Sequence, residues 1–260
     1  MPEGVVRHVR VAPSPSAARA VEALIGYEVA ADVPHVAIPH PQIDLFFRFG
    51  AAARGSLDAH VVGARAHVHR KTPRGVVRTI TARIRLGATE AILGVPAKEI
   101  AGRVVALDDL WGPAATRETF DRLAQAESAL ESTRILDSVL AERVLKARAT
   151  PAVSSLVLDA AGKLVAAPVN AVADELGVSE RHLRRVFLER TGLRPKTFAK
   201  LVRFRRAVEA ARRERAAGWA EIAVTSGYYD QAHLISEFRA IAGMTPRALL
   251  AELRTVASLS

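Results

Sequence analysis

The sequence predicts an α+β fold with a β-rich N-terminal domain, a helical connector and an all-α C-terminal domain. Three observations predict it. A helical unit occurs twice in the last third of the chain, apolar and polar residues alternate in short runs before residue 115, and a helical pattern without Gly or Pro lies between these regions. The patterns divide the chain into residues 1–115, 116–150 and 151–260.

The composition favours an ordinary globular protein in a reducing compartment. Half of the residues are hydrophobic (50%) and a quarter are charged (25%), which is typical of folded domains. The chain has no cysteine, which excludes disulfides and thiolate chemistry. The first residues lack the apolar core of a signal peptide, and no run approaches the roughly 18 apolar residues of a membrane span. We expect a cytoplasmic protein with no membrane partner.

The repeated unit is the strongest feature of the sequence. Its two copies are VNAVADELGVSERHLRRVFLERTGLRP (169–195) and AEIAVTSGYYDQAHLISEFRAIAGMTP (220–246). Gly177 and Gly227 supply the turn of each copy, where a positive φ costs little. Ser179 and Asp230 follow as N-caps of the next helix. Each copy is therefore predicted to be a helix-turn-helix unit whose second helix has an outer face that can enter a DNA groove.

A long helix is predicted between the two units, over residues 196–215. At about 1.5 Å per residue it would span roughly 30 Å, close to the ~34 Å between successive major grooves on one side of DNA. Positive charge gathers in this region, with 13 Lys and Arg against 3 Asp and Glu between residues 181 and 215. A solvated basic face is the alternative, but the overlap with the repeated units favours DNA binding.

Several short motifs give this region a family resemblance. They are SERHLRRVF (179–187), TGLRP (191–195), GYYDQAHL (227–234), EFR (237–239) and GMTP (243–246). In order and spacing they resemble the DNA-binding domain of the AraC/XylS family of transcription regulators, over about the last ninety residues. The resemblance implies a seven-helix domain with two helix-turn-helix units. Its base-contacting positions fall on Arg181, Arg184, Arg185, Gln231, Ala232, His233 and Ser236.

The chemistry of these side chains suits direct readout of bases. Arginine bonds guanine bidentately, and Gln231 is suited to adenine. Ala232 departs from the polar residue often found at its position and is restricted to contact with a thymine methyl group. We expect exposed cations to contact the phosphates, and the candidates are Lys196, Lys200, Arg203 and Arg239.

The first 115 residues contain four candidate strands, which are residues 24–31, 43–49, 61–69 and 78–86. Period-two alternation is clearest in the last of these. The segments PHPQIDLFF (39–47), LGVP (93–96) and LDDLWG (107–112) resemble the N-terminal domain of one subset of AraC-type regulators. The resemblance implies a cupin-like sandwich or barrel that senses a small-molecule effector or forms a homodimer.

Residues 116–148 carry an apolar stripe at helical spacing, formed by Leu123, Leu130, Leu136, Val139 and Leu140. The stripe fits packing against the β-rich domain and a dimer interface equally well. Exposed basic residues away from the DNA face are candidates for contact with RNA polymerase.

Histidines raise one alternative function. Five of the eight lie between His35 and His69, and His67 and His69 would share one face of a strand. They are weak candidates for metal ligands, since polar residues on a strand face account for them as well. Asp44, Asp108 and Asp109 are candidate effector carboxylates, although turn or cap roles are favoured. We find no catalytic constellation and predict no cofactor. The alternative is a cupin-like metal-dependent enzyme or metal sensor with a nucleic-acid-binding appendage.

Overall fold

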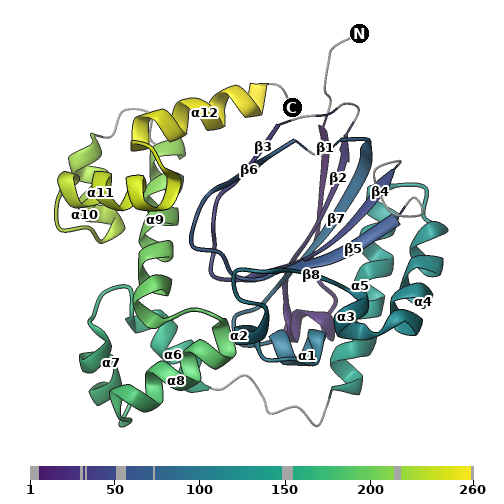
Figure 1. Ribbon diagram of the computed structural model, residues 1–260, viewed down its shortest axis with the longest axis horizontal. Coiled ribbons are helices and arrows are strands. Elements are labelled where there is room, and N and C mark those ends of the chain that lie inside the picture. The colour runs from purple at the N-terminus through teal and green to yellow at the C-terminus, as the bar shows by residue number, and fades with distance from the viewer. Residues whose placement is uncertain are drawn as a thin grey trace.

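The computed structural model describes residues 6–29, 32, 34–50, 57–72, 74–147, 155–213 and 218–258. Figure 1 shows a twisted sheet with helices on one side of the molecule and an arch of helices on the other. The two parts contact each other at two places, where β3 lies beside α12 and where α2 lies beside α8. None of the helices in the described part of the chain has the length and apolar character that a membrane span requires.

The N-terminal domain contains a six-stranded antiparallel sheet in the order β1-β2-β7-β4-β5-β8, and a separate pair of strands, β3-β6. The strands are β1 (Val6–Val11), β2 (Val21–Val29), β3 (His35–Ala37), β4 (Ile43–Gly50), β5 (Leu57–Val62), β6 (His69–Lys71), β7 (Val76–Ile84) and β8 (Val104–Ala106). The predicted strands at 24–31, 43–49 and 78–86 are confirmed as β2, β4 and β7. Residues 30 and 31 lie outside the described part.

The predicted strand at 61–69 is wrong, because β5 ends at Val62 and the chain turns before β6 begins. Past Val62 the chain stays beside the segment before β8, because the Gly63 N–H donates to Arg103 O at 2.9 Å and the Gly102 N–H donates to Ala64 O at 3.0 Å. A Cβ atom at position 63 would lie 1.7 Å from the carbonyl oxygen of Ile100. The chain leaves this segment after Ala64, so the predicted strand does not extend to residue 69.

Alternation along the strands decides which face of the large sheet is covered. Leu45 and Phe47 on β4, and Ile80 on β7, are fully buried in one apolar cluster with α5. The intervening residues of β4 and β7 point to the opposite face. The helices of this domain are η1 (Ala17–Arg19), α1 (Thr89–Leu93), α2 (Ala97–Ile100), α3 (Asp108–Trp111), α4 (Pro113–Ala124) and α5 (Ala129–Lys146). Figure 1 shows α4 and α5 on the outer side of the sheet.

The connector consists of two helices, α4 and α5, with a break at residues 125–128 where Ser128 caps α5. Most of its apolar stripe is buried, since Leu123, Leu136, Val139 and Leu140 join the core of the N-terminal domain. Leu130 is the exception and is 38% exposed. Packing against the β-rich domain is thus confirmed for four of the five stripe residues, and the dimer interface stays a prediction.

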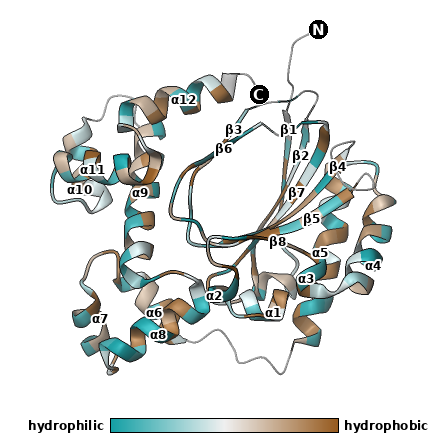
Figure 2. Cartoon of the chain, viewed as in Figure 1, coloured by the Kyte–Doolittle hydropathy of each residue, from teal (hydrophilic) through white to brown (hydrophobic). Residues whose placement is uncertain are grey.

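Seven helices form the described part of the C-terminal domain: α6 (Ser155–Lys163), α7 (Val169–Glu175), α8 (Glu180–Thr191), α9 (Pro195–Arg213), α10 (Trp219–Ser226), α11 (Gln231–Ala242) and α12 (Pro246–Ser258). They share one apolar core. Figure 2 shows hydrophilic and hydrophobic residues alternating along α9, as expected for a helix with one buried side. Residue 215, the expected end of this helix, lies outside the described residues.

Aromatic pairs fix both recognition helices, α8 and α11, on α9. Phe187 of α8 packs edge-on against Phe198 of α9 at a centroid distance of 5.2 Å. Phe238 of α11 packs against Phe204 of α9 at 4.6 Å. All four rings are buried. The repeated Phe of the sequence is therefore the anchor of each unit, and α9 supplies the partner for both.

Both predicted N-caps are confirmed. The Ser179 hydroxyl accepts the backbone N–H of His182 at 3.2 Å, and the Asp230 carboxylate accepts that of His233 at 2.7 Å. Gly177 and Gly227 have positive φ angles of 68° and 90° in the turns before the caps. Each recognition helix therefore begins at a fixed residue.

We predict that Ser179→Ala and Asp230→Ala each lower the free energy of unfolding by about 1 kcal/mol, because each leaves helix N–H groups without an acceptor. Urea denaturation followed by far-UV circular dichroism measures the change. Ser138→Ala, at an exposed position within α5, is the matched control and is expected to change stability by under about 0.5 kcal/mol. Cap variants as stable as this control would contradict the assignment.

Candidate nucleic-acid interface

The outer face of α8 carries the three arginines expected to contact bases. Arg181, Arg184 and Arg185 are all exposed. Arg184 donates from Nε to Glu180 at 2.8 Å, and Arg185 lies 3.5 Å from a Glu189 oxygen. Exposed i,i+4 pairs of this kind contribute little stability, so they exchange readily for a DNA acceptor.

The outer face of α11 is less uniform than the sequence suggested. Gln231, Ala232 and Ser236 are exposed. His233 is also exposed, but its Nδ1 accepts the backbone N–H of Tyr229 at 3.5 Å and its Nε2 lies 3.6 Å from Glu237 Oε1. Both ring nitrogens therefore face other groups of the protein.

Arg203 was expected to contact phosphate, and the structure gives it a different partner. Its Nη2 donates to Oε1 of Glu237, a buried residue of α11, at 2.9 Å. Its side chain is only 16% exposed and lies 5.6 Å from the Tyr228 ring. A buried carboxylate needs a cation beside it, and Arg203 meets that need. This ion pair joins α9 to the second recognition helix.

The two lysines of α9 are more exposed than Arg203. Lys196 is exposed, and Lys200 is 52% exposed and 3.9 Å from Glu237. A surface depression of about 620 Å³ brings both lysines together with His233 and Ser236 of α11. The outer face of α11 and the free cations of α9 thus lie on one side of the domain. Arg239 is exposed farther along α11.

Tyr229 is a candidate that the motifs did not single out. It is 89% exposed and directly precedes the Asp230 cap of α11, while its neighbour Tyr228 is buried. The burial raises the pKa of Tyr228, and Glu237 adds to this effect. The position of Tyr229 in the sequence could have indicated this role. A residue directly before the N-cap of a recognition helix lies at the end of the helix that contacts DNA. A tyrosine hydroxyl can donate to a phosphate oxygen.

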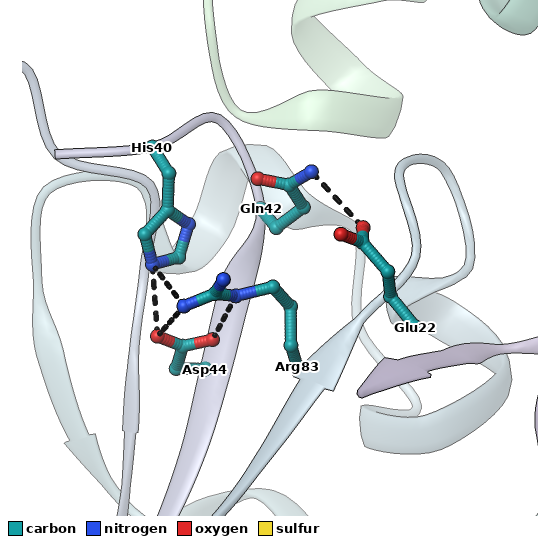
Figure 3. Close-up of polar contacts among 5 residues, drawn as sticks. All are labelled: Glu22, His40, Gln42, Asp44 and Arg83. Carbon is teal, nitrogen blue, oxygen red and sulfur yellow. Dashed lines mark hydrogen bonds and ion pairs between the residues drawn. The ribbon is translucent and has the colours of Figure 1, made fainter. Parts of the chain in front are cut away.

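The N-terminal domain has a buried polar cluster on the sheet face opposite α4 and α5. Figure 3 shows Arg83 of β7 reaching Asp44 of β4, with His40 beside them. Arg83 donates to Asp44 through Nε at 3.0 Å and Nη2 at 3.3 Å. The Nε2 atom of His40 lies 2.9 Å from Asp44 Oδ2 and 3.0 Å from Arg83 Nη2. Nearby, Gln42 donates to Glu22 at 3.0 Å.

Asp44 therefore does not have the turn or cap role that the sequence favoured, because it lies within β4 and is buried. Burial opposes its ionisation, but the hydrogen bond and charge of His40 and those of Arg83 outweigh burial and hold the pKa of Asp44 below its ordinary value. Asp108 and Asp109 lie in the first turn of α3, as a helix-end role requires.

The clustered histidines do not converge on one point. His40 belongs to the Asp44 cluster, and His60 is buried on β5, stacked on Phe46 at 5.4 Å. Burial, followed by the charge of Arg48, lowers the pKa of His60 to about 4. Among the described residues no three His, Cys, Asp or Glu side chains are placed to hold a metal, the pair His67 and His69 included.

Comparisons with known proteins come from family models and solved structures. Residues 172–252 match the model described as Helix-turn-helix domain, and residues 9–106 match one described as Domain of unknown function (DUF6597). No curated protein matches the chain. The chain is similar to ToxT from Vibrio cholerae bound to an unsaturated fatty acid (9% identity, 95% of each chain, TM-score 0.44). It is also similar to the transcriptional regulator CdpR from Pseudomonas aeruginosa (21% identity, 68% of this chain and 46% of that one, TM-score 0.29).

The helix-turn-helix match spans the body of both repeated units and defines the class, a helix-turn-helix DNA-binding protein. The two units, their caps and the helix between them stand in the order and spacing of the motifs that carry the sequence resemblance. The chain is a DNA-binding transcription regulator whose C-terminal domain is of the helix-turn-helix kind, and its motifs resemble those of the AraC/XylS family.

We predict that Asp44→Asn lowers the free energy of unfolding at pH 7 by roughly 3 kcal/mol, because Arg83 keeps its charge and loses its partner. A lowered carboxyl pKa stabilises the fold above the ordinary pKa of 3.8 and loses that effect as the pH falls through the folded value. The difference between wild type and variant should therefore be complete at pH 7 and shrink below about pH 4. Urea denaturation at a series of pH values measures it, and a pH-independent difference would contradict the ion pair.

Proposed function

We propose that one protomer contacts two successive turns of a DNA duplex, with α8 and α11 in adjacent major grooves. The observation that carries the proposal is that two recognition helices, each capped at its N-terminal end and exposed on its outer face, are mounted on the same helix. Such helices contact base edges through their first turns. The net positive charge of this region would draw it to the phosphate backbone.

Base readout is assigned mainly to exposed residues whose polar groups are free or weakly paired. On α8 these are Arg181, Arg184 and Arg185, which suit guanine O6 and N7. On α11, Gln231 suits adenine and Ser236 suits either acceptor or donor edges, while Ala232 offers a methyl contact. His233 would have to turn away from Glu237 to reach a base, so it is assigned a smaller share than Gln231.

Phosphate contacts are assigned to Lys196, Lys200 and Arg239, with Tyr229 as an additional hydrogen-bond donor. All four side chains are exposed. Arg203 is left out of this set because its guanidinium is hydrogen-bonded to Glu237.

The N-terminal domain is assigned a regulatory role, as a sensor of a small-molecule effector or as a dimerisation domain. The polar sheet face around Asp44 and Arg83 supports the first role, since buried polar groups fix ligand orientation in protein pockets. Contact with RNA polymerase belongs to the same proposal and would use surfaces away from α8 and α11.

Selection of bound sites from random DNA, with the full chain, tests the proposal. Two conserved blocks with centres about 10 base pairs apart are expected within each site. An inverted pair of such sites would indicate a dimer. A single conserved block would contradict reading by both units.

We predict that Arg185→Ala weakens binding to the selected site by roughly 1–3 kcal/mol and relaxes base preference at one position. The reason is the loss of a bidentate contact to guanine. Binding to the selected site and to its single-base variants measures both effects. Equal weakening of all sequences would make Arg185 a phosphate contact.

We predict opposite behaviour for two neighbouring cations of α9. Lys200→Ala should lower the slope of log affinity against log salt by about one and leave stability unchanged. Arg203→Ala should remove the cation that is hydrogen-bonded to buried Glu237 and lower the free energy of unfolding by roughly 3 kcal/mol. Salt titrations and urea denaturation of both variants separate the two roles. A salt slope that changes with Arg203 alone would reverse the assignment.

A further inference from the structure

The C-terminal end of α8 is held by the N-terminal domain. Arg190 donates to Glu90 of α1 at 2.7 Å, and Lys98 of α2 lies 3.6 Å from Glu189. Gly192, which ends α8, lies so close to α2 that a Cβ atom there would be 2.9 Å from the Ala97 carbonyl oxygen. This contact lies at the end of α8 that is opposite to its Ser179 cap.

The C-terminal end of α11 is held by the same domain through a different element. The backbone N–H of Val68 donates to Ile241 O at 2.9 Å, and Nη2 of Arg70 donates to Ala242 O at 3.3 Å. These two carbonyls belong to the last turn of α11. Carbonyl groups in the last turn of a helix have no N–H donor within the helix. The N-terminal domain therefore completes the C-terminal cap of the second recognition helix.

Arg70 also makes an ion pair between the two domains on this side. Its Nε and Nη2 atoms donate to the two oxygens of Glu252 on α12 at 2.6 and 2.8 Å. A bidentate pair of this kind fixes direction as well as distance. The guanidinium also places positive charge at the C-terminal end of α11, where the helix dipole favours it. Arg70 is 182 positions from Glu252 in the sequence.

The spacing of the two recognition helices is not set by α9 alone. Their anchors on α9, Phe198 and Phe204, are six residues apart, which corresponds to a rise of about 9 Å and a rotation of about 120° around the axis. The two helices therefore leave α9 in different directions. The distance between the N-terminal ends of α8 and α11 depends on these directions. A second contact on each helix, in addition to its Phe anchor, therefore fixes that distance.

We propose that the N-terminal domain is a clamp that holds the C-terminal ends of both recognition helices and thereby sets the distance and rotation between their DNA-contacting ends. Arg70 is the positioning residue of the clamp at α11. Because both contacts are at the ends opposite the caps, they leave the DNA-contacting ends uncovered. The clamp therefore arranges the two helices for DNA and does not block them. This inference rests on the proposed contact of α8 and α11 with adjacent grooves.

Binding of the full chain to DNA with altered spacing tests the clamp. The probes are the selected site and two versions with one base pair inserted or removed between its conserved blocks. Wild type should prefer the original spacing. In Arg70→Glu this preference should fall by about fivefold or more, the lower range of coupling between protein sites. Combining Arg70→Glu with Glu252→Arg should restore part of it, because the ion pair re-forms with reversed charges while the bond to Ala242 O stays lost.

Three further variants keep the test decisive. Arg74→Glu is the matched control, since Arg74 is exposed in the same domain and the charge change is equal. It should retain the wild-type spacing preference. Arg70→Gln serves if Arg70→Glu does not fold, which circular dichroism detects, and should reduce the preference in the same direction. Glu90→Gln should do so through the contact at α8.

The outcomes are distinguishable. If wild type discriminates between spacings and Arg70→Glu does so equally, the clamp is wrong and the two-groove proposal stands. If Arg70→Glu binds every probe more tightly than wild type, the contact blocks DNA and the sign of the inference is wrong. If wild type itself ignores spacing, reading by two units fails and the clamp fails with it.

Discussion

The C-terminal domain depends on one constraint, the burial of two phenylalanines of a repeated unit against two phenylalanines of a single helix. Phe187 meets Phe198, and Phe238 meets Phe204. Burying a ring of this size contributes a few kcal/mol, and truncating it typically costs ~3–5 kcal/mol. Because the anchor lies in the middle of each recognition helix, the exposed outer face follows from it by helical geometry. The same contact thus fixes both the fold and the DNA-contacting surface.

A second constraint is electrostatic and decides which cation of α9 is held inside the protein. Glu237 is buried on α11, and Arg203 meets it from α9. A buried carboxylate without this cation would be strongly unfavourable, so the guanidinium is held inside the protein. Lys200, one helical turn away from Arg203, keeps its ammonium group in solvent. Arg203 and Lys200 therefore lie in different surroundings, although both are basic residues of α9.

The sequence predicted the features that depend on neighbouring residues and missed those that depend on distant ones. The caps at Ser179 and Asp230 and the buried stripe of the connector follow from local spacing. The role of Arg203 does not, because it depends on a carboxylate 34 positions away. The end of β5 likewise depends on distant residues, since Gly63 lies against Ile100 at the end of α2.

The strand β6 contacts both the large sheet of the N-terminal domain and the C-terminal domain. Side chains alternate along a strand, so consecutive residues face opposite sides. Arg70 faces Glu252 and the end of α11, while the Nζ atom of Lys71 lies 5.7 Å from the centre of the Phe46 ring on the large sheet. Burial and the nearby charges of Arg48 and Arg65 lower the pKa of Lys71. Two adjacent residues of one short strand therefore contact the large sheet and the C-terminal domain.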